Sequence, residues 1–264
     1  MTTIAGALLA GGAGLIVGSF LNVCIYRLPR EQSVAWPASR CTSCLRSLAW
    51  FENIPVLSWL ILRGRCRTCN AIVSLAYPAV ELMTAILFAA AYVAYGPTLL
   101  LAVRLVFISA LIVLFAIDFE HQILPNVITL PGVAVGFMAS LLLPPGWQSS
   151  LIGLAAGGVF PFLIAEAYLR LRGQEGMGMG DFKMLAMVGA FLGWPLIWAT
   201  LMIACLLGIV IGGGFLLLSR RGLATRVPFG TFIAVAALVC ALAGDAVIAF
   251  YERGMDAYIA WVTA

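Results

Sequence analysis

Two aspartates, each beside a long apolar run, are the residues of this chain best suited to catalysis. Asp118 follows the apolar run 111–117, and Asp181 lies between the glycine-rich loop 176–180 and another apolar run. A carboxylate at membrane depth is costly and usually faces a partner or a water-filled cavity. Two carboxylates that meet can share one proton and activate a water molecule, as aspartic proteases do. The pair therefore predicts hydrolysis of a peptide bond at a membrane surface.

Each aspartate also has a simpler interpretation, as a helix cap or a solvated residue. Asp181 follows glycines and opens a helix, so an N-cap is a real alternative. Catalysis is favoured because both aspartates are expected on one membrane face, and because Gly178 and Gly180 would let backbone or substrate approach closely. Lys183 would either contact lipid headgroups or lower the pKa of a carboxylate. We therefore treat the two glycines and Lys183 as a supporting turn.

The elements that position these residues are membrane-spanning helices. The 264 residues are 63% hydrophobic and only 10% charged, whereas soluble domains carry about 25% charged residues. A span needs roughly 20 apolar residues. Eight runs predict an all-α polytopic membrane protein with helices near 4–25, 76–95, 98–117, 124–143, 150–169, 183–194, 196–218 and 228–250. The short sixth helix and the turn at Gly193 decide between seven and eight spans.

The basic residues indicate the orientation of these helices. All but two of the 15 lysines and arginines lie in or beside four loops on one side of the predicted membrane: 26–75, 118–123, 170–182 and 219–227. The positive-inside rule makes this side cytoplasmic. The net charge of +4 is thereby explained without a nucleic-acid partner. Both aspartates then face the cytoplasm.

Four cysteines in the first cytoplasmic loop form two CxxC pairs, separated by 21 residues. They are Cys41, Cys44, Cys66 and Cys69. This spacing is close to that of four-thiolate zinc sites. Two disulfides or four free thiols are the alternatives, and a reducing cytoplasm disfavours disulfides. Because a four-thiolate site has no open position, we predict structural rather than catalytic Zn²⁺.

The predicted spans and the cysteines divide the chain into three parts. Residues 1–25 form a first transmembrane helix, 26–75 a cytoplasmic cysteine-rich domain, and 76–264 a transmembrane aspartic peptidase domain. The cysteine-rich domain holds seven arginines against two glutamates. About 50 residues bury little apolar surface, so a metal staple would stabilise the domain. Gly11, Gly12, Gly14 and Gly18 lie in the first helix, where small residues at a spacing of four indicate close helix packing.

Several stretches between residues 18 and 230 carry a resemblance to a known family. They are 18–29, the two CxxC pairs, 52–59, 77–81, Asp118 with Pro125 and Asn126, 178–183 and 228–230. Together they resemble the type IV prepilin peptidases, bifunctional leader peptidases and N-methyltransferases of the GxGD aspartic protease family. Presenilin-like proteases share the GxGD turn alone, and archaeal preflagellin peptidases generally lack the cysteine loop. The combination therefore favours the bacterial bifunctional type.

The resemblance implies a substrate and two reactions at the bacterial inner membrane. Prepilins of type IV pili and pseudopilins of type II secretion would be cut after a glycine by Asp118 and Asp181. The new N-terminal amine would be methylated with S-adenosylmethionine, whose site we expect within 26–81, around Asn53, Pro55 and Glu81. A peptidase without methyltransferase activity is the alternative. A transporter that uses the aspartates as a proton relay, or a scaffold docking partners on its zinc knuckle, are rivals from other classes.

Overall fold

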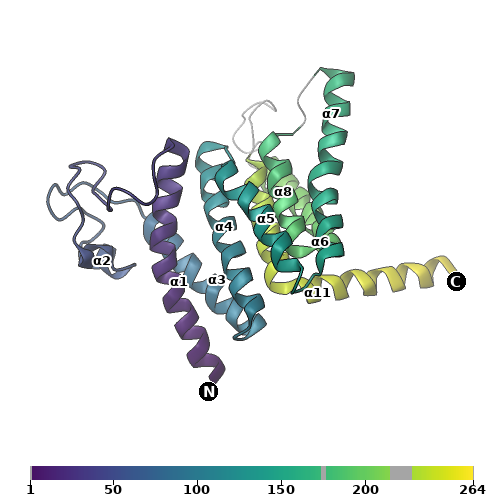
Figure 1. The fold of residues 1–264 in the computed structure, drawn as a ribbon, viewed down its shortest axis with the longest axis horizontal. Helices are drawn as coiled ribbons and strands as arrows, with labels where there is room; N and C mark the ends of the chain where they lie inside the picture. Colours follow the sequence, from purple (N-terminus) through teal and green to yellow (C-terminus); the bar gives the residue numbers. More distant parts are fainter. Residues whose placement is uncertain (1, 174–176, 215–227, 264) are drawn as a thin grey trace. The chain divides into compact units, whose positions relative to one another are not determined.

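The computed structural model describes residues 2–173, 177–214 and 228–263 (Figure 1). These residues form two compact units, 1–117 and 118–264, which are considered separately. Within the described residues there are helices, turns and two isolated β-bridges, but no strand. The predicted all-α fold is confirmed.

The first unit is built on two helices that lie side by side, α1 (Thr2–Arg27) and α3 (Ala76–Tyr95) (Figure 1). A Cβ on Gly14 would lie 2.7 Å from the Cα atom of Ala85, and one on Gly18 would lie 2.7 Å from that of Glu81. The predicted close packing is confirmed at Gly14 and Gly18 but not at Gly11, where a Cβ would make an ordinary contact at 3.5 Å, or at Gly12, where it would meet nothing within 4 Å. Since lipid tails are as apolar as the helices, such backbone approach is what holds membrane helices together.

The segment between α1 and α3 contains little regular structure. It has the short helices η1 (Leu28–Arg30), η2 (Trp50–Asn53) and α2 (Leu57–Ile61), joined by turns. The helix α4 (Leu99–His121) follows α3 and leads to the second unit, which begins near its end at Asp118.

The second unit surrounds one buried helix, α8 (Met179–Leu192). Around it pack α5 (Asn126–Ser140), α6 (Trp147–Leu154), the π-helical turn η3 (Ala155–Val159), α9 (Trp194–Leu207) and α11 (Phe229–Thr263). The remaining elements are α7 (Phe160–Arg172) and the π-helical turn η4 (Gly208–Gly212). From Met184 to Leu192, every residue of α8 except Ala186 is buried. A helix that is apolar on all sides needs such an enclosure.

Glycines fix the depth at which α8 packs. The backbones of Gly153 in α6 and Gly189 in α8 are so close that a side chain on either would collide with the other. A Cβ on Gly157 would likewise meet the backbone of Leu185. These contacts fix the position of α8, which carries Asp181 in its first turn.

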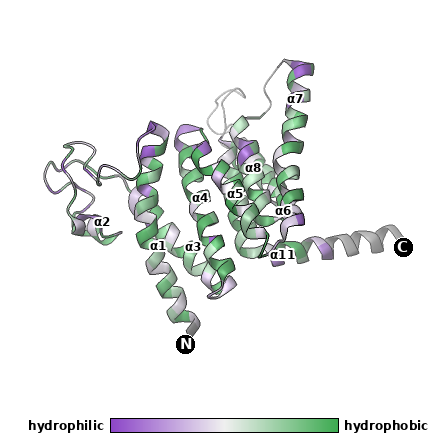
Figure 2. Cartoon of the chain, viewed as in Figure 1, coloured by the Kyte–Doolittle hydropathy of each residue, from purple (hydrophilic) through white to green (hydrophobic). Residues whose placement is uncertain are grey.

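Six helices of the described residues are long and apolar enough to cross a membrane: Thr3–Arg30, Ala76–Tyr95, Leu99–His121, Trp147–Arg172, Trp194–Gly212 and Phe229–Arg253 (Figure 2). The chain is therefore a multi-pass membrane protein. The other two predicted spans correspond to the shorter helices α5 and α8. The total of eight spans stays a prediction, and residues 215–218 of the seventh predicted helix lie outside the described residues.

One predicted boundary is wrong in a way that affects the site. We expected a loop at 118–123, but α4 continues to His121, and Asp118 lies in its last turns. Residues 119–121 contain no helix breaker, so the helix ends only at Gln122, whose φ is 55°. The amide of Gln122 still donates to the carbonyl of Asp118, at 2.9 Å. Asp118 is thus held by helical backbone.

Candidate active site and metal centre

Asp118 is a buried carboxylate, 5% exposed, at the N-terminal end of α11. Its Oδ2 atom accepts hydrogen bonds from the backbone N–H of Thr231, at 2.7 Å, and from the Thr231 hydroxyl, at 3.0 Å. The N–H groups in a first helical turn lack partners within the helix, and the helix dipole attracts negative charge there. The first turn of α11 therefore orients Asp118.

Gly230 makes this approach possible. A Cβ at this position would lie 2.9 Å from Oδ2 of Asp118 and 3.0 Å from Cδ1 of Leu124. A side chain here would force Asp118 to shift, so a glycine at the end of the stretch 228–230 lets Thr231 approach the carboxylate without displacing it. Thr231 and Leu124 were missed in the sequence. The available signal was that both adjoin motif residues, Gly230 and Pro125.

Asp181 is half-buried in the first turn of α8. Gly178 is the N-cap of this helix, so the interpretation of Asp181 as an N-cap is wrong. Asp181 instead occupies the third helical position. Burial and the negative charge of Asp118 raise its pKa to about 6, and the backbone amide of Gly178 offsets part of that rise. The site therefore contains two carboxyl groups that sense each other's charge.

The two glycines of the predicted supporting turn differ in what they contribute. A Cβ on Gly180 would lie 2.9 Å from Cβ of Leu124, so this glycine is required for close packing. A Cβ on Gly178 would make an ordinary contact, 3.4 Å from Oδ2 of Asp181. Leu124 thus packs against both Gly180 and Gly230, between the two segments that carry the aspartates or their donors.

Lys183 is oriented towards α5. Its Nζ donates to Oδ1 of Asn126 at 2.8 Å, which ties α8 to the first residue of α5. The expectation that Lys183 lowers the pKa of a carboxylate is wrong for Asp181, whose pKa is raised without a contribution from this lysine. Lys183 therefore links the start of α8 to the start of α5.

The four cysteines of the CxxC pairs come together. Their sulfur atoms all lie within 4.8 Å of one another, and the Sγ atoms of Cys41 and Cys69 are 3.8 Å apart. Zn–S bonds of about 2.3 Å in a tetrahedron place the sulfurs about 3.8 Å apart, so the donor set and its size fit Zn²⁺. Backbone amides lower the pKa of Cys41, and that of Cys66 to about 6, which favours thiolates at these two positions. The amide of Ala71 lowers the pKa of Cys69, but burial and the neighbouring cysteines raise it to about 11.

The two halves of this cluster have the same backbone. Cys41 accepts from the amide of Leu45 at 3.0 Å, and Cys66 accepts from that of Asn70 at 3.0 Å. Leu45 and Asn70 both have left-handed conformations, with φ of 58° and 57°. Each half is closed by a β-bridge, Arg40 to Ser47 and Arg65 to Ile72. Two copies of one turn thus present the four thiols.

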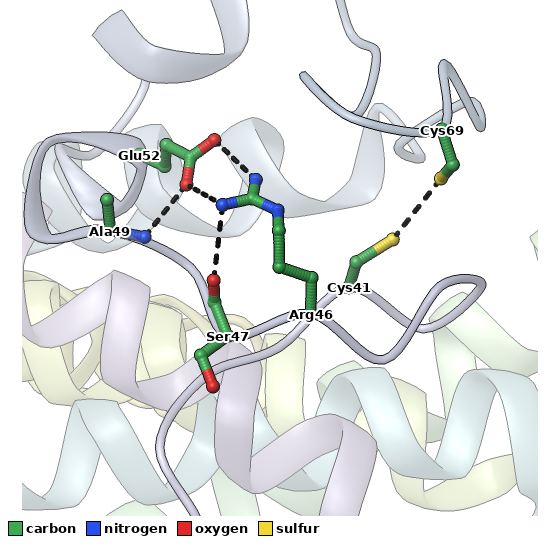
Figure 3. A network of polar contacts seen from close by, with 6 residues as sticks. All are labelled: Cys41, Arg46, Ser47, Ala49, Glu52 and Cys69. Carbon is green, nitrogen blue, oxygen red and sulfur yellow. Dashed lines mark hydrogen bonds and ion pairs between the residues drawn. The ribbon is translucent and has the colours of Figure 1, made fainter.

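An ion pair connects the first half to the turn that follows it (Figure 3). Arg46 contacts Glu52 with both terminal nitrogens, at 2.7 and 3.0 Å, and Glu52 also accepts from the amide of Ala49 at 2.8 Å. The guanidinium of Arg46 and this amide lower the pKa of Glu52. Glu52 opens the stretch 52–59, so the cysteine cluster positions that stretch.

Glu81 on α3 holds the same stretch from the other side. Its Oε2 accepts from the amide of Val56 at 2.7 Å, and the amide of Leu57 donates to the carbonyl of Pro55 at 2.6 Å. With φ of 60° and ψ of −50°, Val56 forms the rare, strained type of γ-turn. A β-branched residue seldom adopts positive φ. Pro55 and Glu81, predicted from different elements, thus meet at this turn, and Asn53 ends η2 just before it.

Comparison with known proteins places the chain in a family. A model described as Bacterial Peptidase A24 N-terminal domain matches residues 13–95, and the Type IV leader peptidase family model matches residues 105–213. A relative from Aeromonas hydrophila is 36% identical over 264 residues, covering 90% of each chain. The chain belongs to the type IV leader peptidase family.

Other relatives of this family carry the same name. The relatives from A. hydrophila, Myxococcus xanthus and Bacillus subtilis are each called prepilin leader peptidase/N-methyltransferase. The M. xanthus protein is 43% identical over 211 residues, 79% of this chain and 62% of its own length. The B. subtilis protein is 36% identical over 243 residues, 91% of this chain and 95% of its own. No solved structure matches the chain. The resemblance seen in the sequence is confirmed.

Proposed function

We propose that this protein removes the leader from prepilins and pseudopilins and then methylates the new N-terminus. The observation that carries the first activity is the pair Asp118 and Asp181, in which burial and the charge of Asp118 raise the pKa of Asp181 to about 6. A carboxyl with this pKa can hold a proton near neutral pH while its neighbour is ionised. The family and the names of the relatives support this function.

Cleavage needs one proton on the carboxyl pair and one water. The ionised carboxylate takes a proton from the water, whose oxygen forms a bond to the carbonyl carbon of the scissile peptide. The protonated carboxyl stabilises the carbonyl oxygen and then gives its proton to the leaving nitrogen as the C–N bond breaks. Because the two groups titrate together, the proton belongs to the pair. Thr231 keeps Asp118 oriented throughout.

The peptidase test compares the wild type with Asp118→Asn and Asp181→Asn on a synthetic prepilin in detergent. Intact mass identifies the product. We expect cleavage after the leader glycine by the wild type alone. Cleavage that survives in either variant would contradict the two-aspartate mechanism. A folded wild-type protein without cleavage would favour the transporter or scaffold.

The second activity is proposed for the segment around Asn53, Pro55 and Glu81. S-adenosylmethionine supplies an activated methyl group, which the neutral amine of the cleaved substrate accepts. Strained turns are often found at functional sites, and here Glu81 accepts the amide of Val56 at 2.7 Å. We infer that Glu81 is a positioning residue that keeps this turn in its binding conformation.

Glu81→Leu tests this role because it removes the acceptor, whereas Glu81→Gln retains a carbonyl oxygen. We expect Glu81→Leu to lose methylation while cleavage persists, and Glu81→Gln to restore part of it. The loss of the leader measures cleavage, and the added methyl mass on the cleaved product measures methylation. Equal loss of both activities in Glu81→Leu would mean that Glu81 acts on overall folding only.

We propose that the cysteine cluster holds structural Zn²⁺ and that the cluster and the aspartates face the cytoplasm at the inner membrane. The sulfur spacing supports the metal, and the arginines of 26–75 support the orientation. Metal analysis of the purified chain and of Cys66→Ser tests the first point. Labelling single cysteines on either side of intact cells tests the second.

A further inference from the structure

An arginine-lined hollow lies beside the cysteine cluster, at the end of α2. Its volume is about 610 Å³, and its lining includes Ile61, Leu62, Arg63, Arg65 and Arg67. The backbone alternates here: Gly64 and Cys66 are buried, and the arginines on either side of them are exposed. The turn that follows α2, in which Arg63 and Gly64 both have left-handed conformations with φ of 51° and 65°, brings the three arginines to the lining of one hollow.

These three positive charges outnumber the carboxylates near them, since only Arg67 interacts with one, helping to lower the pKa of Glu52. The segment 26–75 contains two glutamates, and Glu52 is bound to Arg46. In the described part of the chain, neither Arg63 nor Arg65 forms an ion pair, and Arg67 lies 5.5 Å from the ring of Phe51. Cys66 of the cysteine cluster also lines the hollow, and the thiolates of the cluster would offset part of this positive charge. The segment keeps an excess of arginines, so the hollow remains attractive to an anion such as a phosphate.

An exposed apolar surface adjoins the hollow. On α2, Leu57, Leu60 and Ile61 are 56%, 57% and 78% exposed. They are spaced three and four residues apart, which places them on one helix face. The opposite side is held to the domain through Trp59, whose Nε1 donates to the carbonyl of Val73 at 3.1 Å. A short helix with an apolar face beside arginines has the composition of an interfacial membrane element.

We propose that this hollow and the apolar face of α2 dock an anionic phospholipid of the bilayer that α1 and α3 cross. The segment 26–75 joins these two candidate spans, so headgroups are within its reach. The guanidinium groups would bind the lipid phosphate in pairs of hydrogen bonds, and the α2 face would contact the upper acyl region. The inference does not depend on the peptidase or methyltransferase activity.

Other occupants fit this surface less well. The methyl donor carries a positive sulfonium, and the leader of the expected substrate is basic, so both would be repelled by three arginines. A free anion would satisfy the arginines but would leave the apolar face of α2 uncovered. A lipid satisfies both features with one molecule.

The test measures lipid retained by the full-length protein in detergent, using native mass spectrometry. Phosphatidylglycerol is titrated against phosphatidylcholine with the same acyl chains, and inorganic phosphate is added as a competitor. Each basic residue near an anionic membrane surface contributes roughly fivefold to binding. We therefore expect Arg63→Gln, Arg65→Gln and Arg67→Gln together to weaken phosphatidylglycerol retention by about 100-fold at low salt.

A matched variant with Arg30, Arg40 and Arg172 changed to Gln removes the same charge from exposed positions outside the hollow. It should retain the lipid, as should a variant with lysines at the three hollow positions. Ile61→Ser should weaken lipid retention without affecting phosphate. Thermal unfolding checks that each variant is folded.

Three outcomes would overturn the proposal. One is equal retention of the two lipids by the wild type. Another is an equal loss in the matched variant, which would mean that net charge alone attracts lipid. The third is displacement of the lipid by millimolar phosphate together with indifference to Ile61→Ser, which would make the hollow a site for free anions.

Discussion

Thr231→Val tests whether the N-terminal turn of α11 takes part in cleavage. The hydroxyl of Thr231 donates to Oδ2 of Asp118 at 3.0 Å, and its amide donates to the same oxygen at 2.7 Å. Valine has nearly the same shape as threonine and keeps the amide. The substitution therefore removes one of two hydrogen bonds from the carboxylate and leaves the packing largely intact.

The expected loss follows from the strength of this bond. A hydrogen bond to a charged group contributes about 1.5–3 kcal/mol, and about 1.4 kcal/mol corresponds to a factor of ten in rate. Because the amide still holds Oδ2, the effect should lie near the lower end. We expect kcat/KM for prepilin cleavage to fall about tenfold, while the thermal unfolding midpoint changes little.

A further variant makes this prediction decisive. Thr231→Ser keeps a hydroxyl and should restore most of the rate. A rate within about twofold of wild type for Thr231→Val, or the same loss in Thr231→Ser, would refute the catalytic role of this contact.

Three other predictions concern the same unit and the metal. Gly230→Ala should reduce cleavage about 100-fold, because the added Cβ would lie 2.9 Å from Oδ2 of Asp118. Gly208→Ala is the control: its Cβ would lie 3.6 Å from Phe232, and its cleavage rate in the same kinetic assay should stay near that of the wild type. Cleavage should decline as pH rises above about 6, because the shared proton is then lost from Asp181; a profile of kcat/KM that stays flat to pH 9 would contradict this. Chelation of the bound metal should abolish protection of 26–75 against proteolysis while the membrane helices remain intact, as followed by mass spectrometry of the fragments.

The helices could be predicted from the sequence because the bilayer imposes a length and a composition on each of them. The first and second long helices occur at α1 and α3, within a few residues of the expected bounds. The end of α4 was mispredicted because hydropathy decreases at Asp118 while helical hydrogen bonding continues to His121. An apolar run indicates that a segment is buried in lipid or protein. The residue at which a helix ends depends on local backbone geometry, which the apolar run does not determine.

The aspartates and cysteines of the candidate sites could be identified in the sequence, whereas the residues that contact and position them were harder to predict. The types and spacing of the aspartates and cysteines suffice to suggest their chemistry. Thr231 is 113 residues from Asp118 in sequence, and the residues around Thr231 do not predict a hydrogen-bond partner so far away in the chain. The γ-turn at Val56 was equally hidden, because a β-branched residue is a poor indicator of positive φ.

The two aspartates are held in different ways. Asp118 has one oxygen fixed by two donors from the first turn of α11. Asp181 begins a helix that is enclosed by protein, so its backbone is fixed through Gly189 while its carboxyl stays half-buried. One group is therefore oriented by hydrogen bonds and the other by packing. A substrate carbonyl that reaches the pair would meet one carboxyl oriented by hydrogen bonds and a second positioned by packing, with one proton shared between them.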